Sequence, residues 1–254
     1  MISPDFFLRT ESGFLAHGQR DIGGQDFGWG VARFDDGSPL EIEAATLPAP
    51  DGEYLANTRY RSRLIRVSGD ARARSWSELQ GMRDQLAALP RSGDMIWFDQ
   101  YGQTRWVIGG AQGRGAFEAR YDMDVPYADW MVEWRCQDPM IYGEKRTVSV
   151  PIGEKAVIRH RGTVETWPTI EITGPVNAGL RLTIENRNLI INRDIKSGER
   201  ISVTQHDVRS NTGGVLTRDI TGLLGRVPAF RGTTIHSSGS GHGQIRAWVY
   251  DTWV

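Results

Sequence analysis

The sequence predicts a mainly β protein of two domains, with one helix in the N-terminal domain and a β-sandwich as the C-terminal domain. The chain has 254 residues and 30 glycines, and short polar turn clusters separate its apolar segments, as in strands joined by tight turns. Only one segment repeats its apolar residues at helical spacing. The balance of charge changes sign near residue 143.

The charge of the two halves differs although the whole chain has a net charge of -1. Residues 1–143 carry 15 basic and 21 acidic side chains, a net charge of −6, whereas residues 144–254 carry 15 and 10, a net charge of +5. Such a split is typical of two units with different surroundings. A nucleic-acid-binding protein would instead show a concentrated basic patch, so we expect no specific nucleic-acid partner.

Other classes of protein are excluded by simple features of the chain. The single cysteine excludes an internal disulfide and any metal cluster held by several cysteines. No segment approaches 18 uninterrupted apolar residues, so we expect no membrane span and no membrane partner. The start, MISPDFFLRTESGF, lacks a basic region followed by an apolar stretch and does not resemble a signal peptide. We expect a soluble protein made in a cytoplasm.

The N-terminal segments predict strands with one interruption. Residues 1–35 mix aromatic residues and glycines, as in FGWGVARF, and predict short strands and turns. Two prolines and an Asp-Gly step in TLPAPDGEYLAN predict an exposed loop over residues 46–57. A strand is expected from Arg59 to Val67, ended by Ser68-Gly69-Asp70.

One helix is predicted in SWSELQGMRDQLAALP, residues 75–90. Ser75 can cap its first turn, and Glu78, three residues on, completes a capping box. Pro90 follows the end. Three apolar residues share one face at helical spacing, namely Leu79, Met82 and Leu86. We expect this face to pack on a sheet rather than to bind a partner.

After the helix the apolar period changes to two. MIWF and TRWVIG flank DQYGQ and predict a hairpin. In AFEARYDMD and WMVEWRC, apolar residues alternate with charged ones, which predicts two half-buried strands. Cys136 lies on the apolar face of the second strand, where a free thiol behaves as a small hydrophobe. An activated thiol needs a base or an electropositive niche, so Cys136 is predicted to be a core residue and not a nucleophile.

The domain boundary is predicted in WRCQDPMIYGEK, residues 134–145. Pro139 cannot donate a hydrogen bond to a strand ladder, and it restricts the residue before it. Tyr142-Gly143 then gives way to a charged run, at the point where the net charge changes sign. These signals predict an N-terminal domain over residues 1–143 and a C-terminal domain over residues 144–254.

Every segment beyond this boundary is typical of strands. TVSV, AVIRH and TIEIT are short and β-branched, and Leu180, Leu182 and Ile184 alternate with polar residues. LIIN and RISVTQ flank KSGE and predict a hairpin. NTGG, residues 211–214, predicts a turn, and QIRAWVYDTWV predicts a last strand. Strands at this spacing predict a β-sandwich.

Candidate catalytic and metal-binding residues are few. Asp122 and Asp124 share one face of a strand, but alternating acids are usually the solvent face and not a catalytic pair. His236 and His242 flank HSSGSGH, a loop too flexible for a zinc site. The other histidines are isolated: His17, His160 and His206.

Glycine-rich segments do not occur in the context of a nucleotide site. GRGAFE and GSGHGQ lack the third glycine of a dinucleotide fingerprint, and no Walker motif is present. No G-x-S-x-G elbow is present either. The sequence therefore predicts no catalytic, cofactor-binding or metal-binding residue, and no enzyme.

The order of these segments resembles the distal tail protein family of long-tailed, non-contractile bacteriophages, which are also described as minor tail proteins. YRSRLIRVSGDARARSWSELQGMRDQLAAL resembles the family's strand, turn and helix. WRCQDPMIYG resembles the end of its N-terminal domain, and WPTIEITG, residues 167–174, resembles its Trp-Pro strand. IEN, LIIN and IKSGERISV follow in the family's order.

One segment departs from the family's pattern, a Pro-Gly-x-Asn-x-Ile run near the end. FRGTTIH keeps Gly232 and Ile235, but Arg231 and Thr234 stand at the proline and asparagine positions. The resemblance therefore does not imply the local turn.

The resemblance implies a structural role in the virion. In the family, a β-rich N-terminal domain with one helix forms a hexameric ring, and a galectin-like C-terminal β-sandwich sits outside it. This homo-hexamer joins the last ring of the tail tube protein to the baseplate or the tail-tip hub protein. Such a component of the phage tail tip, made in the host cytoplasm, needs no cofactor.

A second reading is a carbohydrate-binding module that recognises the host cell surface. Galectin sugar sites use H-x-N-P-R and a later W-x-x-E-x-R. The segment HRGTVETWP contains His160, Arg161 and Trp167, but not at that spacing, and a fold alone does not carry function. A third reading, a glycosidase, would need two carboxylates that converge in a cleft.

Overall fold

The structure is a computed structural model that describes residues 5–18, 27–37, 45–49, 52–56, 61–100, 102–113, 115–121, 125–205, 207–214 and 216–254. It divides the chain into two compact units, Met1–Ile141 with Val254 (unit 1) and Tyr142–Trp253 (unit 2). The described residues of both units are mostly strand, with a single α-helix, so the predicted fold class is confirmed. The division lies two residues from the boundary predicted at Gly143.

Unit 1 is built around a sheet that closes on itself. Its strands are β1 (Phe7–Thr10), β2 (Leu15–Gly18), β3 (Gly28–Asp35), β6 (Arg63–Arg72), β7 (Asp94–Gln100), β8 (Gln103–Ala111), β9 (Ala116–Arg120) and β10 (Tyr127–Cys136). They are hydrogen-bonded in the order β8-β7-β1-β2-β3-β6-β10-β9. β10 also pairs with β8, at Trp134↔Ala111 and Arg135↔Gly110, which closes a barrel and leaves β9 outside it.

The inside of the barrel is aromatic. The ring centroid of Phe14 lies 5.0 Å from Trp29, 5.6 Å from Trp130 and 6.3 Å from Trp134. The indole of Trp130 donates hydrogen bonds to the carbonyl oxygens of Gly30 and Asp70, both at 3.1 Å. Along β10 the exposed and buried residues alternate as the sequence predicted, and the β7–β8 hairpin is confirmed.

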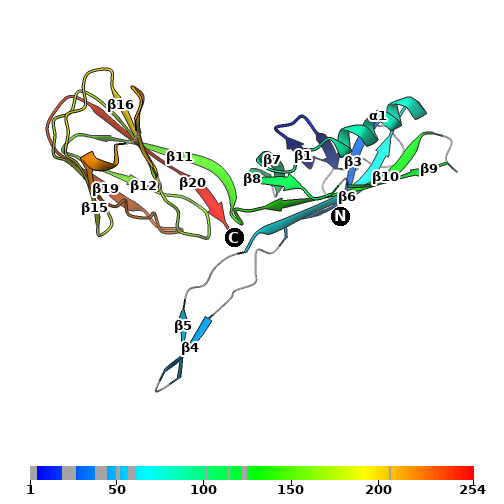
Figure 1. Cartoon of the computed structure of the whole chain (residues 1–254), viewed down its shortest axis with the longest axis horizontal. Coiled ribbons are helices and arrows are strands. Elements are labelled where there is room, and N and C mark those ends of the chain that lie inside the picture. The colour runs from blue at the N-terminus through cyan, green and yellow to red at the C-terminus, as the bar shows by residue number, and fades with distance from the viewer. Residues whose placement is uncertain are drawn as a thin grey trace. The chain divides into compact units, whose positions relative to one another are not determined.

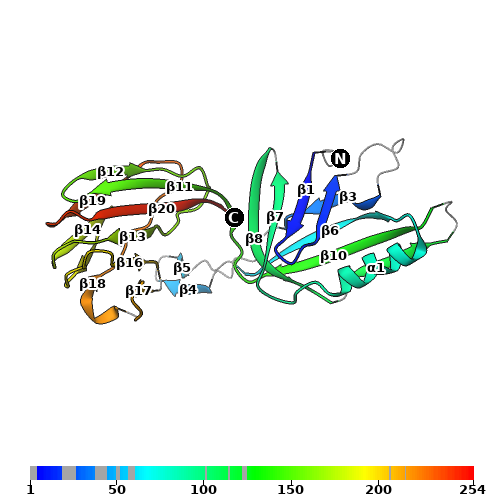
Figure 2. The ribbon, with the colours of Figure 1, turned by 90° about the horizontal axis from the view of Figure 1, so that it is seen from above.

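The predicted helix is confirmed as α1 (Trp76–Ala87), which runs along β6 and β10 (Figures 1 and 2). Ser75 Oγ accepts a hydrogen bond from the amide of Glu78 at 3.1 Å. The Glu78 carboxylate accepts from the amide of Arg74 at 2.7 Å, one residue earlier than in the usual capping box. Leu79 and Leu86 are buried and Met82 is half-buried, so the predicted face packs on the sheet.

Strand β6 does not end at Ser68-Gly69-Asp70, and that part of the prediction is wrong. β6 continues to Arg72, and Gly69 lies opposite Val31 of β3. A Cβ atom at Gly69 would lie 1.8 Å from the carbonyl oxygen of Gly30, because the register of β3 shifts between Val31 and Arg33. The glycine marks a close approach of two strands and not a turn.

The loop predicted over residues 46–57 is also wrong. β4 (Ala45–Ala49) and β5 (Gly52–Ala56) pair from Ala45↔Ala56 to Ala49↔Gly52, as a two-stranded sheet. Pro48 lies within β4, which is possible because a strand with one paired edge does not need every amide for a ladder. Among the described strands, β4 and β5 pair only with each other.

Unit 2 is a sandwich of two sheets, which confirms the predicted β-sandwich. One sheet has the order β17-β16-β13-β20-β11 and the other β12-β19-β14-β15-β18. The strands are β11 (Ile141–Pro151), β12 (Lys155–Ile158), β13 (Thr169–Thr173), β14 (Leu180–Ile184), β15 (Arg187–Ile191), β16 (Arg200–Val203), β17 (Val208–Ser210), β18 (Ile220–Gly222), β19 (Thr233–Ser238) and β20 (Gln244–Trp253). Aliphatic residues such as Ile172, Leu182 and Ile235 fill the space between the sheets.

Two details of unit 2 differ from the sequence prediction. β15 pairs with β14 and β18, whereas β16 pairs with β13 and β17, so LIIN and RISVTQ do not form a hairpin. Both strands bury every second residue, so each can cover the core from its own sheet. The KSGE connection therefore crosses from one sheet to the other. β11 runs from Ile141 without a break through Gly143, where a Cβ atom would lie 2.6 Å from the Trp253 ring.

Candidate assembly surfaces

Cys136 lies in the core of unit 1, as predicted. Its side chain is 0% exposed, and a Cβ atom at Gly109 would lie 2.8 Å from its Sγ atom. Burial raises the pKa of the thiol to about 12, although the charge of Arg63 lowers it. The thiol is therefore protonated at neutral pH, and Cys136 is a packing residue.

A buried arginine beside Cys136 holds the chain where it leaves the barrel. Arg63 is 2% exposed, and its Nε donates to the carbonyl oxygen of Pro139 at 2.7 Å. Its Nη1 donates to the carbonyl oxygens of Asp36, at 2.8 Å, and Gly37. Burial lowers the pKa of this guanidinium, and Asp36 raises it. Sequence reasoning missed Arg63, although it lies at the same alternate positions of β6 as the buried residues Ile65 and Val67.

Two histidines of unit 2, His236 and His242, lie on different elements. His236 lies on β19 opposite Lys155 and Thr183, whereas His242 lies in the following loop, where its amide donates to Pro175. Within the described ranges, no three His, Cys, Asp or Glu side chains are placed to hold a metal ion. His17 is exposed on β2. Three candidates lie outside the described residues: Asp122, Asp124 and His206.

The residues of HRGTVETWP do not form an open sugar platform. His160 is 2% exposed, and its ring contacts the carbonyl oxygen of Val227 at 3.2 Å and accepts from the Gly162 amide. The Trp167 ring is covered by the guanidinium of Arg226 at 4.9 Å from its centroid. The carbohydrate-binding reading gains no support from these side chains.

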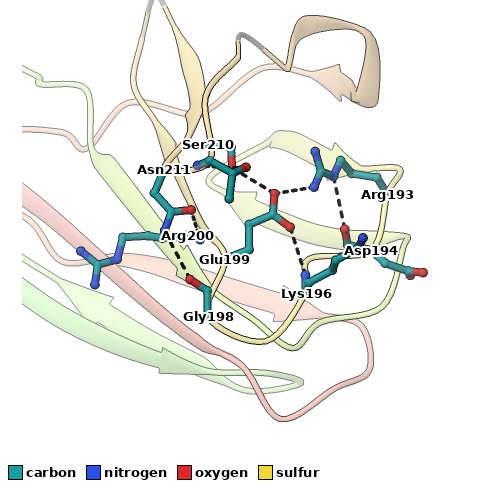
Figure 3. A network of polar contacts seen from close by, with 9 residues as sticks. Arg193, Asp194, Lys196, Gly198, Glu199, Arg200, Ser210 and Asn211 are labelled. Atoms are coloured by element: carbon teal, nitrogen blue, oxygen red, sulfur yellow. Dashed lines mark hydrogen bonds and ion pairs between the residues drawn. The ribbon is translucent and has the colours of Figure 1, made fainter.

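A buried carboxylate in unit 2 accepts three hydrogen bonds (Figure 3). Glu199 is 5% exposed and accepts from the Lys196 amide at 3.1 Å, from Ser210 Oγ at 3.0 Å and from Arg193 Nη2. Burial raises the pKa of Glu199. The hydrogen bonds and the charge of Arg193 lower it by more, so the pKa of Glu199 is lowered overall. Because both of its oxygens accept hydrogen bonds from groups of unit 2, this carboxylate stabilises the fold around β16 and β17.

Unit 1 carries an apolar surface on the outside of its barrel, which we call the outer sheet face. Strands β1, β7 and β8 lie side by side (Figure 2). With β2 they carry a row of residues that lie opposite one another in turn, Leu15, Arg9, Trp97 and Trp106. The Arg9 guanidinium lies 4.8 Å from the centroid of the Trp97 ring. In the next row Met95 lies opposite Ile108. Leu15 is 46% and Ile108 42% exposed.

A second apolar surface of unit 1 lies between α1 and the edge strand β9, and we call it the α1–β9 groove. The groove has a volume of about 310 Å³ and is lined by Trp76, Leu79, Gln80, Arg83, Phe117, Glu118, Ala119 and Tyr121. The rings of Trp76 and Tyr121 stack at 4.9 Å with an interplanar angle of 19°. Trp76 is 45% and Tyr121 80% exposed. Exposed apolar patches of this kind mark interaction sites in soluble proteins.

The sequence contained part of the signal for both surfaces. MIWF and TRWVIG are apolar on both faces of their strands, which a half-buried strand does not require. For the groove, the only signal was Tyr121, which continues the alternation of AFEARYDMD beyond the end of β9. Among the described helices, α1 included, none is long and apolar enough to span a membrane.

Comparison with known proteins finds a similar fold among solved structures. No family model matches the chain, and no curated protein matches its sequence. Among solved structures, it is similar to Dit (gp 19.1) of phage SPP1, described as a paradigm of the hub adsorption apparatus in phages that infect Gram-positive bacteria. The sequence identity is 13% and the TM-score 0.68, over 98% of this chain and 99% of that chain.

Two structures of the phage P2 baseplate in its activated conformation, with Ca and with Sr, also match. Their identities are 8% and 6% and their TM-scores 0.43 and 0.42, over 92% of this chain and 98% of theirs. At these scores they carry no weight in the argument. The match to SPP1 Dit shows that the chain shares the fold of that phage protein. The resemblance to distal tail proteins is thereby confirmed at the level of the fold.

Proposed function

We propose that the protein is a structural component of a phage tail tip. Six copies form a ring that joins the last ring of tail tube protein to the baseplate or the tail-tip hub protein. The observation that carries this proposal is the similarity to SPP1 Dit over nearly the full length of both chains. A fold alone does not determine function, so surfaces of this chain must support the proposal independently.

Two features of unit 1 support self-association. The outer sheet face and the α1–β9 groove leave large aromatic side chains in contact with solvent, and a ring would bury them. The β4–β5 hairpin pairs with no third strand among those described. An isolated two-stranded hairpin is marginally stable in water, so a contact with another copy would stabilise it.

The two units have different roles in this assembly. Unit 1 forms the ring, because it carries both apolar surfaces and the hairpin. Unit 2 is a galectin-like sandwich on the outside of the ring, where it contacts other tail components. The role needs no catalytic step and no cofactor, and it places the protein in the virion.

Native mass spectrometry of the full chain, together with cryo-microscopy of the virion tail, tests this function. We expect a six-copy assembly in concentrated solution and six-fold density for this chain at the tail tip. Monomers or two-fold dimers in both measurements would overturn the proposal. A monomer that is retained on host cell-wall carbohydrate, and is absent from the tail tip, would favour the carbohydrate-binding reading instead.

A further inference from the structure

The two apolar surfaces of unit 1 differ in shape and in composition. The outer sheet face is a set of side chains on four adjacent strands, with Trp97 and Trp106 in one row. The α1–β9 groove is a hollow between a helix and an edge strand, with Tyr121 at its rim. A two-fold dimer places the same patch on both sides of its interface, whereas a ring joins two different patches head to tail. Unit 1 has the two unlike patches that a ring requires.

We propose that the outer sheet face of one copy packs against the α1–β9 groove of the next copy. This inference rests on the proposed ring and names the surfaces that close it. The exposed Tyr121 of one copy packs against Trp97 and Trp106 of its neighbour, beside Ile108 on the same face of β8. Tryptophan, tyrosine and arginine are the residues that most often dominate the energy of an interface.

The charges on the two surfaces are complementary. The outer sheet face carries Arg9 on β1. It also carries Glu11, directly after β1, whose backbone amide donates a hydrogen bond to the carbonyl oxygen of Met95. The groove is lined by Arg83 and Glu118. Within the described ranges none of these four charged side chains has an ion-pair partner in its own chain. Arg9, which also lies on the Trp97 ring, can meet Glu118 of the neighbouring copy, and Glu11 can meet Arg83.

The backbone of β9 adds a second kind of complementarity. β9 pairs with β10 on one side, from Tyr127↔Arg120 to Met131↔Ala116, and with no other described strand. A strand with an unpaired edge is a liability unless it is covered. A neighbouring copy seated on the groove would cover this edge as well as the aromatic rings.

Two single variants of the full chain test the contact. Ile108→Glu places a charge on the outer sheet face, and Tyr121→Glu places one at the groove. Both positions are well exposed, at 42% and 80%, so both variants should keep the circular dichroism spectrum of the parent chain. Val157→Glu, at an exposed position of unit 2, is the matched control and should assemble like the parent chain.

The decisive measurement is the mass of an equimolar mixture of the two variants. Each variant alone should be monomeric at concentrations where the parent chain assembles. In the mixture, the intact groove of Ile108→Glu meets the intact outer sheet face of Tyr121→Glu. Because the other two surfaces are blocked, the product should be a 1:1 heterodimer that grows no further.

The outcomes separate this inference from the proposed function. A parent chain that assembles while either variant also assembles, or a mixture that forms no heterodimer, overturns the contact and leaves the ring standing. A parent chain that stays monomeric in concentrated solution and in the virion overturns both. A monomeric Val157→Glu control would overturn the assignment of the interface to unit 1.

Discussion

Replacing Glu199 with alanine tests the polar network that holds β16 and β17 in unit 2. The buried carboxylate accepts hydrogen bonds from the Lys196 amide, Ser210 Oγ and Arg193 Nη2. A hydrogen bond to a charged group contributes about 1.5–3 kcal/mol, and breaking a buried ion pair costs about 3–5 kcal/mol. The Arg193 side chain is 28% exposed, so water replaces part of what it loses. We expect a loss of about 3 kcal/mol in the free energy of unfolding of unit 2.

Glu199→Gln is the matched control, because it keeps the shape of the side chain and one carbonyl acceptor but removes the charge. We expect it to cost about 1–2 kcal/mol. The two units need not unfold together, so urea unfolding of the full chain should be followed by hydrogen exchange of peptides from residues 193–211. Alanine and glutamine variants that match the parent chain would show that the network contributes nothing.

The same network predicts how the stability of unit 2 depends on pH. The folded pKa of Glu199 is lowered, so its contribution is present above the unfolded pKa, about 4.3 for a glutamate, and is lost as pH falls through the folded value. The difference in stability between the parent chain and Glu199→Gln should therefore be full at neutral pH and shrink below about pH 4. A difference that stays constant down to about pH 3 would refute the electrostatic reasoning.

Three further predictions concern packing and the two units. With a thiol pKa of about 12, Cys136 should resist alkylation in the native protein at neutral pH, and rapid labelling would contradict its burial. Gly69→Ala should cost more than about 3 kcal/mol in thermal unfolding, because a backbone oxygen lies 1.8 Å from the new Cβ atom. Gly81→Ala is its control, since Gly81 lies in α1 with no atom within 4 Å, and should stabilise by about 0.5–1 kcal/mol. A fragment from Tyr142 to Val254 should be a folded β monomer by circular dichroism and sedimentation, and an unfolded fragment would contradict independent units.

Local patterns were sufficient to predict many of the individual elements of both units. The alternation in WMVEWRC and QIRAWVYDTWV predicted β10 and β20, because side chains of a strand point to opposite faces at every second residue. Ser75 and Glu78 predicted the start of α1, because capping involves only neighbouring residues. The two-sheet sandwich followed from the spacing of strands and turns in the C-terminal half.

Two of the errors lie where distant segments decide the outcome. Gly69 resembled a strand end, but the bulge of β3 requires a glycine inside β6. LIIN and RISVTQ resembled a hairpin, but the two sheets of the sandwich each take one of them. Turn residues define where a chain changes direction, and they do not determine which strand it meets next.

The sequence by itself determined the fold class, the helix and its cap, and the alternation of buried and exposed residues along most strands. Only the tertiary structure decided that β10 returns to β8 to close the barrel, that Arg63 is buried against the carbonyl oxygen of Pro139, and that the tryptophans of β7 and β8 face outward. A period of two separates the faces of a strand but does not say which face is covered. That depends on pairing between residues far apart in the chain, and their contacts leave no periodic trace in either segment.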